Sequence, residues 1–374
     1  MAIVDAQRLK ALVAAIFEKA GCAADEAARI GHFLTEANLT GHDSHGVARV
    51  PRYVEWLREG KVLAGQTVSA VVDTPSITVL DGHYGFGQSV GPQAVQVGIA
   101  KAKANGLAAV ALRHAGHLGR IGDFAEMAAA EGLVSIHFVN VVGSILVAPF
   151  GGVERRLSTA PYCVGVPLPG RSPLLLDFAT SLVAEGKVLV ASMGGKPIPD
   201  DALVAPDGSR SGDPAVLYGP YPDGPGPRDP MQGPGAIRAF GEHKGSGLAF
   251  MCEILGGALT GAGTTGPGKR FCNGMMSIYI DPQVLDPAGF FPAEAAAYVD
   301  YYKSARPAEP GGEVLVPGEA ESRARARKLK DGVPLSDGTW DAITATARAL
   351  GIGDEVIRSA LIGTTGAGQP GTPA

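Results

Sequence analysis

The chain has 374 residues, of which 45% are hydrophobic and 18% charged, and its formal net charge is −5. That size and composition predict a globular protein with a large core and at least two subdomains. The negative net charge argues against a nucleic-acid surface, and no apolar run reaches the roughly 20 residues of a membrane span.

Cysteine usage and the N-terminal pattern favour a cytoplasmic protein. The N-terminus enters an amphipathic pattern directly, with no signal-peptide pattern. The cysteines are far apart in the sequence, which indicates reduced thiols rather than a zinc framework. They are Cys22, Cys163, Cys252 and Cys272. We therefore expect neither a membrane nor a nucleic acid as a partner.

The first part of the chain is predicted to be helical. Apolar residues recur at helical spacing after Asp5, a candidate N-cap, and again from Ile30 and from Val50. The C-terminal part has the same periodicity in residues 322–330, 337–350 and 354–362. We predict a small helical domain over residues 1–72, joined by the helices of residues 310–365.

The middle of the chain mixes strands and helices and predicts an α/β domain over residues 73–309. The predicted strands are residues 76–80, 107–112, 133–139, 161–168, 174–178 and 275–280. The predicted helices are residues 93–104, with Pro92 suited to the first turn, 121–131, 182–191 and 244–259, the last apolar enough to be buried. The Pro- and Gly-rich residues 220–239 predict a long loop, a lid or an extra interface, and residues 366–374 a disordered tail.

The stretch Asp43-Ser44-His45-Gly46, followed by Arg49 and Tyr53, gathers an imidazole, a hydroxyl, a guanidinium and a phenol. If one helix runs through Arg49 and Tyr53, their spacing of four places them on one face, provided that Pro51 falls in its first turn. Arginine binds carboxylates with two parallel hydrogen bonds, and histidine exchanges protons near neutral pH. The cluster suits a small substrate with a carboxylate and a carbonyl; an ordinary capped helix with a solvated face explains it equally well.

Two nucleotide-binding motifs are almost complete. Gly85-Phe86-Gly87 with Gly91 is one residue too long for the dinucleotide fingerprint, and no acidic residue follows at the required distance. Residues 263–269 match most of a P-loop, but Arg270 replaces the magnesium-binding Ser or Thr. We interpret both as glycine-rich loops.

Residues 113–122 (RHAGHLGRIG) lie between a predicted strand and a predicted helix, where α/β proteins often place ligand loops. Their glycines allow close approach of a ligand, and the helix N-terminus attracts phosphate. His114 and His117 lack a third ligand at a metal-binding spacing, so we predict no metal site. Three further polar clusters are typical of caps and turns when taken singly; they are residues 176–181, 242–247 and 317–319.

In this order and spacing, the clusters resemble the malate/L-lactate dehydrogenase family of the non-Rossmann type. The matching segments are GHDSHGVARVPRYV, HLGRIGDFAEMAAAEGLVSIHFVN, APFGG, LDFATSLVAEGKV, EHKGSGLAFMCEILGGALTG and VPGE with the later GVPL. The resemblance covers residues 5–360, and the segments most similar to the hydroxycarboxylate dehydrogenase members are GRIG, SIHFVNVVG and residues 240–245. It implies a mixed α/β fold with a mainly antiparallel sheet and a homodimer that uses NAD or NADP to interconvert a 2-oxo acid and a 2-hydroxy acid by hydride transfer.

The resemblance also implies roles for individual residues. His45, with Ser44, would lie at the substrate carbonyl and exchange the proton, although some members give that role to the histidine that matches His117. Asp213 would orient a histidine. Substrate contacts would come from Arg49, which binds the carboxylate, Tyr53 and Thr159. Cofactor contacts would come from His45, Gly119, Arg120, Ile121, Leu176, Asp177, Phe178, Ala179, Thr180, His243, Lys244, Asn273, Pro317, Gly318 and Glu319.

Departures from the family pattern bear on the substrate and not on the reaction class. Residues 158–161 read Ser-Thr-Ala-Pro where the family often has Gly-Thr-Asn-Pro, and residues 211–214 read Ser-Gly-Asp-Pro instead of Thr-Thr-Asp-Pro. Reduction of a cyclic imine such as Δ1-piperideine-2-carboxylate is therefore an alternative. So is a catalytically silent binding protein, although the joint presence of Ser44, His45, Arg49, His117 and Lys244 argues against it.

Overall fold

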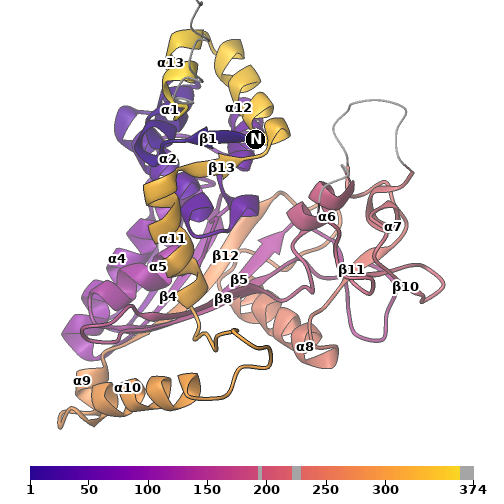
Figure 1. The fold of residues 1–374 in the computed structure, drawn as a ribbon. Coiled ribbons are helices and arrows are strands. Elements are labelled where there is room, and N and C mark those ends of the chain that lie inside the picture. The colour runs from indigo at the N-terminus through magenta and orange to yellow at the C-terminus, as the bar shows by residue number, and fades with distance from the viewer. Residues whose placement is uncertain (193–195, 221–228, 363–374) are drawn as a thin grey trace, which may run out of the picture. The chain divides into compact units, whose positions relative to one another are not determined.

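The computed structural model describes residues 1–192, 196–220 and 229–362. The predicted tail of residues 366–374 lies outside this range, as does the centre of the predicted loop of residues 220–239. The chain forms two compact units, coloured by residue number in Figure 1. Unit 1 contains Met1–Glu55 and the chain from Glu321 onward, and unit 2 contains Trp56–Ala320.

Unit 1 is built mainly from helices supplied by both ends of the chain. They are α1 (Ala6–Lys19), α2 (Ala24–Leu39), α3 (Val50–Arg58), α11 (Glu319–Asp331), α12 (Asp337–Ala349) and α13 (Asp354–Ser359). Asp5 caps α1 as predicted, because its Oδ1 accepts hydrogen bonds from the backbone of Gln7 and Arg8. The chain ends meet in an antiparallel ladder of β1 (Ala2–Val4) and β13 (Val333–Leu335).

Unit 2 is centred on a seven-stranded sheet in the order β2-β3-β4-β12-β5-β7-β8. The bounds are β2 (Ser69–Asp73), β3 (Ile77–Asp81), β4 (Leu107–Ala115), β5 (Val134–Val142), β7 (Pro161–Val166), β8 (Leu174–Ala179) and β12 (Cys272–Ile280). All neighbouring strands are antiparallel except β3 and β4. The predicted mainly antiparallel sheet is therefore confirmed.

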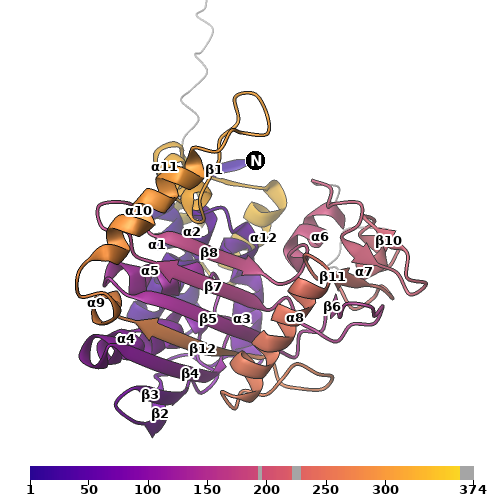
Figure 2. The ribbon, with the colours of Figure 1, turned by 90° about the horizontal axis from the view of Figure 1, so that it is seen from below.

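Helices cover the two faces of this sheet differently. α4 (Gly87–Asn105) and α5 (Gly122–Ala130) pack on one face, where Val95, Ile99 and Phe124 share a core with strand residues such as Leu112 and Tyr279. α8 (His243–Cys252) and the π-helix η3 (Glu253–Ala258) cross the opposite face over β5 and β12 (Figure 2). Two further helices, α9 (Pro282–Leu285) and α10 (Phe290–Lys303), follow β12.

A smaller four-stranded sheet has the order β10-β9-β11-β6. It consists of β6 (Val147–Ala148), β9 (Leu203–Val204), β10 (Arg210–Ser211) and β11 (Ala236–Arg238), with α6 (Glu185–Ser192) and α7 (Ala215–Tyr218) beside it. Leu217, Tyr218 and Ile237 are fully buried in its core. Strands of two or three residues show no alternating pattern, which is why the sequence did not predict them.

Three predicted helices differ from the structure. α4 begins at Gly87, so Pro92 lies inside it and not in its first turn; the burial of Val90 and Ala94 outweighs the cost of the proline, about 3 kcal/mol. The apolar helix predicted over residues 244–259 ends at Cys252 and continues as η3. It is not buried, since only one side packs on the sheet, and Phe250 is 59% exposed.

The third difference concerns the predicted helix of residues 182–191. Residues 177–179 belong to β8, and α6 begins only at Glu185. Asp177 therefore does not cap that helix. None of the helices in the described part of the chain combines the length and the apolar character needed to cross a bilayer.

Candidate functional site

The residues predicted from the sequence fall into two groups, one in each unit. Unit 1 contains Ser44, His45, Arg49 and Tyr53, and unit 2 contains the rest. We describe each group within its own unit.

In unit 1, two short 3-10 helices link α2 to α3: η1 (Asp43–His45) and η2 (Val47–Arg49). Ser44 and His45 are half-buried in η1. Arg49 ends η2, and its Nε donates to the Ser44 carbonyl oxygen at 2.6 Å. Pro51 does fall in the first turn of α3, but α3 starts at Val50, so Arg49 and Tyr53 do not share one α-helical face.

Tyr53 is buried, with 1% of its surface exposed. Its ring meets Phe17 edge to face at 6.4 Å between centroids. An aromatic contact of this kind fixes α3 against α1. The ring of Tyr53 therefore supports the turn that carries His45.

A buried amide ties the two sides of this turn together. Asn38 is 1% exposed; its Nδ2 donates to Asp43 Oδ1 at 2.6 Å, and its Oδ1 accepts from the Val47 backbone at 2.8 Å. Gly46 passes so close that a Cβ there would lie 2.1 Å from Asn38 Oδ1. The Lys328 ammonium, on α11, donates to the Asn38 carbonyl oxygen. These contacts hold the backbone on both sides of Ser44 and His45.

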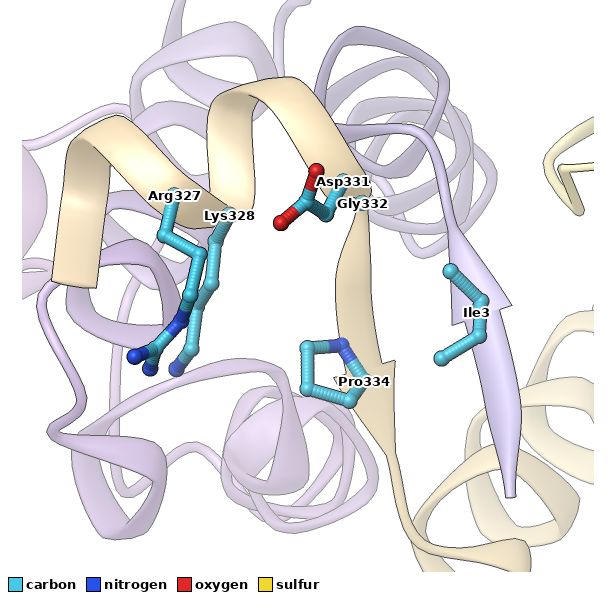
Figure 3. A pocket seen from close by; sticks show the side chains of 6 residues that line it. All are labelled: Ile3, Arg327, Lys328, Asp331, Gly332 and Pro334. Atoms are coloured by element: carbon cyan, nitrogen blue, oxygen red, sulfur yellow. The ribbon is translucent and has the colours of Figure 1, made fainter.

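The pocket in Figure 3 lies between α11 and the ladder of β1 and β13. It is lined by Ile3, Arg327, Lys328, Asp331, Gly332 and Pro334. None of the predicted site residues lines it. Its relevance to the site is limited to Lys328, whose ammonium reaches Asn38.

In unit 2, the loop of residues 113–122 is held by backbone and amide contacts. The His117 carbonyl oxygen accepts from Gln88 Nε2 at 3.2 Å, and the Leu118 amide donates to Asn273 Oδ1 at 2.8 Å. Gly87 lies against His117, because a Cβ there would be 2.2 Å from the His117 carbonyl oxygen. Only glycine allows this close approach. Asn273 is 2% exposed and positions the loop from within, instead of offering its amide to a ligand.

Arg120 points into the protein. It is 2% exposed, its Nη1 donates to Asp123 at 2.6 Å, and both Nη atoms lie 3.0 Å from Glu126 Oε1. Burial, together with the Glu126 carboxylate, raises the pKa of Asp123 to about 7 against the opposing effect of Arg120. The Arg120 guanidinium is therefore occupied by carboxylates and does not offer itself to a 2′-phosphate.

The N-terminus of α5, expected to attract phosphate, already holds a carboxylate. Asp177 Oδ2 accepts from the Gly122 amide at 2.7 Å. A side-chain anion at this position replaces an external one. Asp177 is thus a link between β8 and α5, with Gly119 and Ile121 in the loop just before the helix.

Other predicted residues of β8 are placed differently. Leu176 is 40% exposed, and the Phe178 ring stacks edge to face on Phe240 at 5.2 Å. Thr180 follows Ala179 and is fully buried; its amide and its Oγ1 both donate to the Ala160 carbonyl oxygen. Thr180 thereby fixes the segment just before β7, where Thr159 lies next to Ala160.

The Phe240 amide donates to the Thr180 carbonyl oxygen, which brings the end of β8 beside the start of α8. Glu242, at the N-cap of α8, has a φ of 59°, a region that side chains other than glycine rarely adopt. Its carboxylate is held by Arg210 and Arg238 at 3.0 and 2.5 Å. His243 and Lys244 follow and are exposed. The amides of Lys244, Gly245 and Ser246 already donate to backbone carbonyl oxygens, so it is the exposed Lys244 cation at this helix N-terminus that suits a phosphate.

The last predicted segment, Pro317-Gly318-Glu319, touches β8. The Leu175 amide donates to the Pro317 carbonyl oxygen at 3.2 Å, and Gly318 has a φ of 88°. The Glu319 carboxylate pairs with Lys303. The structure thus places residues 317–319 against Leu175 of the edge strand β8, and the start of α5, which follows residues 119–121, against Asp177 of the same strand.

Asp213 is not near a histidine among the described residues. It is exposed, and its Oδ1 accepts from the amide of Ala215, the first residue of α7, at 2.9 Å. His114 pairs with Asp81 at 3.1 Å and stacks on Tyr84 at 5.0 Å. No cluster of three or more metal-ligating side chains occurs in the described chain.

Sequence reasoning missed several buried polar residues that hold the site: Asn38, Asn140, Ser158 and Glu253. Each is at most 5% exposed. A signal was present for two of them, since Asn140 and Glu253 interrupt the apolar runs SIHFVN and MCEILGG. A polar residue in such a run must find a hydrogen-bonding partner when it is buried.

Comparisons with known proteins agree on one family. A family model described as malate/L-lactate dehydrogenase matches residues 4–344. The chain is 39% identical over 361 residues to hydroxycarboxylate dehydrogenase B of Escherichia coli (strain K12), covering 95% of this chain and 96% of that one. It is 34% identical over 335 residues to an L-lactate dehydrogenase of Cupriavidus necator, covering 88% and 92%. A solved malate/lactate dehydrogenase structure from E. coli superposes with a TM-score of 0.88 at 39% identity, covering 96% and 98%.

Proposed function

This chain belongs to the malate/L-lactate dehydrogenase family and is a 2-hydroxy acid dehydrogenase, or 2-oxo acid reductase, and we propose that its hydride carrier is NAD or NADP. The assignment as a 2-hydroxy acid dehydrogenase rests on the match, along nearly the whole chain, with relatives named for this chemistry. We further propose that it acts as a homodimer in the cytoplasm.

The cofactor proposal is supported by the chemistry of unit 2. The exposed His243 and Lys244 at the N-terminus of α8 suit the pyrophosphate, and the adjoining edge formed by residues 176–180 and 317–319 offers apolar surface beside them. When bound, the nicotinamide supplies the hydride for the carbonyl carbon and accepts it in the reverse direction. Because Arg120 is buried among carboxylates, it gives no support for NADP over NAD.

The roles of the protein side chains follow from charge and proton chemistry. Arg49 binds the substrate carboxylate, because a guanidinium pairs with it through two hydrogen bonds. Either His45 or His117 gives a proton to the developing alkoxide in reduction and takes it back in oxidation. Thr159 contacts the substrate from the segment before β7 that Thr180 holds at Ala160. These groups bind and orient the substrate, which is the main requirement of a hydride transfer.

The test is to follow the absorbance of NADH, and separately NADPH, over a panel of linear 2-oxo acids and one cyclic imine, Δ1-piperideine-2-carboxylate. We expect turnover of a linear 2-oxo acid, with a preference for one nicotinamide. Turnover of the imine alone would show that the substrates are cyclic imines and not linear 2-oxo acids. Absence of both turnover and nicotinamide binding, the latter measured by fluorescence titration, would overturn the proposal.

A further inference from the structure

We propose that two buried residues, Glu253 and Asn140, are positioning residues of the reaction. They form the centre of a continuous chain of hydrogen bonds inside unit 2. In order, the chain runs through Ser158, Glu253, Asn140, Asn273 and the backbone amide of Leu118. One end adjoins Thr159 and the other adjoins His117, so the inference rests on the site roles proposed above.

The Glu253 carboxylate is held by three donors. Ser158 Oγ donates to its Oε1 at 3.0 Å, and the Thr265 amide and Asn140 Nδ2 donate to its Oε2 at 2.7 and 3.2 Å. Glu253 is 5% exposed, and no lysine or arginine of the described chain pairs with it. An amide of the same shape would either place an N–H against the Thr265 or Asn140 donor or reverse the hydrogen bond with the Ser158 hydroxyl.

Asn140 is the junction of the chain, and its side chain is fully engaged. Besides Glu253, its Nδ2 donates to the Gly263 carbonyl oxygen at 2.8 Å, and its Oδ1 accepts from the Gly274 amide at 3.0 Å. Its backbone oxygen accepts from Asn273 Nδ2 at 2.8 Å. Asn140 is completely buried. Because a buried amide with three partners has one orientation, a shift at Glu253 is passed on to Asn273.

The backbone around this chain is irregular on both sides. Glu253 begins the π-helix η3, and β12 shifts its register against β4 between Asn273 and Met275. Gly256 and Gly274 touch where the two irregularities meet, since a Cβ on Gly274 would lie 2.1 Å from the Gly256 carbonyl oxygen. π-Helical turns and strand bulges concentrate at functional sites because they redirect side chains. Here they place the Glu253 carboxylate beside Ser158 and the Asn273 amide beside Leu118.

A role in packing alone does not require this arrangement. Buried polar networks cost desolvation, and apolar side chains of similar volume stabilise a core at least as well. This network joins the segment of Thr159, proposed to contact the substrate, to the segment of His117, proposed to transfer the proton. It fixes the distance between the two groups, which a hydride transfer with a coupled proton transfer needs.

The test variant is Glu253→Gln, which keeps the volume of the side chain and reverses one hydrogen bond. We expect kcat to fall about tenfold, KM for the 2-oxo acid to rise severalfold, and the kinetic isotope effect with nicotinamide deuterated at the transferred hydrogen to increase. The isotope effect and KM do not depend on the fraction of folded enzyme. A purely structural role would therefore leave both unchanged and lower only the apparent kcat.

The matched control is Thr260→Val, just after η3. Thr260 is 1% exposed, and its Oγ1 donates to the Gly256 and Gly257 carbonyl oxygens, outside the chain described above. We expect Thr260→Val to lower Tm without changing the isotope effect or KM. Should Glu253→Gln fail to fold, Ser158→Ala takes its place, with an expected rise in KM for the 2-oxo acid and no change in KM for the nicotinamide.

A second readout needs no activity. Hydrogen exchange of the amides of residues 116–122 and 157–160 should become faster in Glu253→Gln than in the wild type, and should not change in Thr260→Val. Unchanged exchange in both segments would overturn the inference. Failure of the wild type to turn over any substrate would count against the proposed function alone, so the two failures are distinguishable.

Discussion

The two histidines proposed for proton transfer are each fixed through the backbone next to them. His45 lies in a turn whose flanks, Asp43 and Val47, are bound by one asparagine side chain. The His117 carbonyl oxygen accepts a hydrogen bond from Gln88 Nε2. The next residue, Leu118, donates its amide to Asn273 Oδ1. The backbone next to each imidazole is therefore held by buried amides. Fixed placement is what general acid catalysis requires.

Replacing each histidine by alanine identifies the proton donor. We expect the variant without the donor to lose about 10²–10⁴-fold in kcat, with a smaller change in KM. It should also lose the limb of the pH profile that reports the imidazole. Steady-state kinetics of His45→Ala and His117→Ala from acid to alkaline pH provide the measurement. If both variants keep wild-type kcat, neither histidine is the donor.

Arg49 is expected to act mainly on substrate binding. A hydrogen bond to a charged group contributes about 1.5–3 kcal/mol, so Arg49→Ala should raise KM for the 2-oxo acid by about 10–100-fold. The control is Arg52→Ala, because Arg52 lies close by on α3 and pairs at the surface with Glu55 at 2.6 Å. An Arg49→Ala enzyme with the KM of Arg52→Ala would remove Arg49 from the carboxylate site.

His137 predicts an acid-dependent loss of stability that is unrelated to catalysis. It is completely buried between Ser277 and Ser135, and burial lowers its pKa to about 3. The unfolded chain takes up a proton near pH 6.5 that the folded protein does not accept. Stability supplied by the neutral imidazole is thus present above about pH 6.5 and falls towards pH 3, by up to ~1.4 kcal/mol per pH unit.

Urea unfolding of the wild type and of His137→Gln at several pH values tests this. We expect the free energy of unfolding of the wild type to fall more steeply between about pH 6.5 and 4.5 than that of the variant. Parallel curves for the two proteins would show that His137 is not responsible for the pH dependence of the free energy of unfolding.

At the scale of elements, the start of α5 is a structural junction. The Arg120 guanidinium packs on Gly122 and binds Asp123 and Glu126, while the Gly122 amide binds Asp177 of β8. Removing one partner of a buried ion pair leaves uncompensated charge and costs about 3–5 kcal/mol. Here three carboxylates would remain together.

Arg120→Met should therefore destabilise the protein by about 3–5 kcal/mol and leave the ratio of NADPH to NADH activity unchanged. Thermal unfolding and paired kinetics measure the two effects. Arg156→Met is the control, since Arg156 pairs with Glu154 at the surface. A change in nicotinamide preference in Arg120→Met, without loss of stability, would assign Arg120 to the cofactor.

Elements with long apolar periodicity were predictable from the sequence. The stripe of α1 and its Asp5 cap, and the strands β4, β5, β7 and β12, follow directly from residue spacing. The sequence did not predict that α4 continues through Pro92, because tertiary packing decides whether a proline inside a helix is tolerated.

The direction of side chains was only partly predictable. The inward turn of Arg120 had a signal, namely acidic residues three and six positions later, in the helix that follows it. The pairing of Glu253 with Ser158 joins segments far apart in the chain, and no local pattern reports it.

At the scale of the whole molecule, α10 supports the proposed homodimer. Val299 is its only buried residue in a single chain, whereas Tyr298 and Tyr301 are 63% and 74% exposed. Aromatic side chains clustered at a surface are typical of interfaces. Sedimentation equilibrium should give twice the mass of the chain, and Tyr298→Glu with Tyr301→Glu should lower it. A monomeric wild type would contradict the proposal.

The ladder between β1 and β13 joins residues 2–4 to residues 333–335. During synthesis, at roughly 5–20 residues per second, the first strand leaves the ribosome tens of seconds before its partner exists. For that interval the apolar stripe of α1, which includes Leu9, Leu12 and Ile16, lacks the C-terminal half of its unit, whereas unit 2 is complete once residue 320 has emerged. A nascent chain of this protein therefore has a long window in which its N-terminal helices are targets for chaperones, and a ribosome that stalls late releases a protein whose unit 1 lacks its C-terminal half.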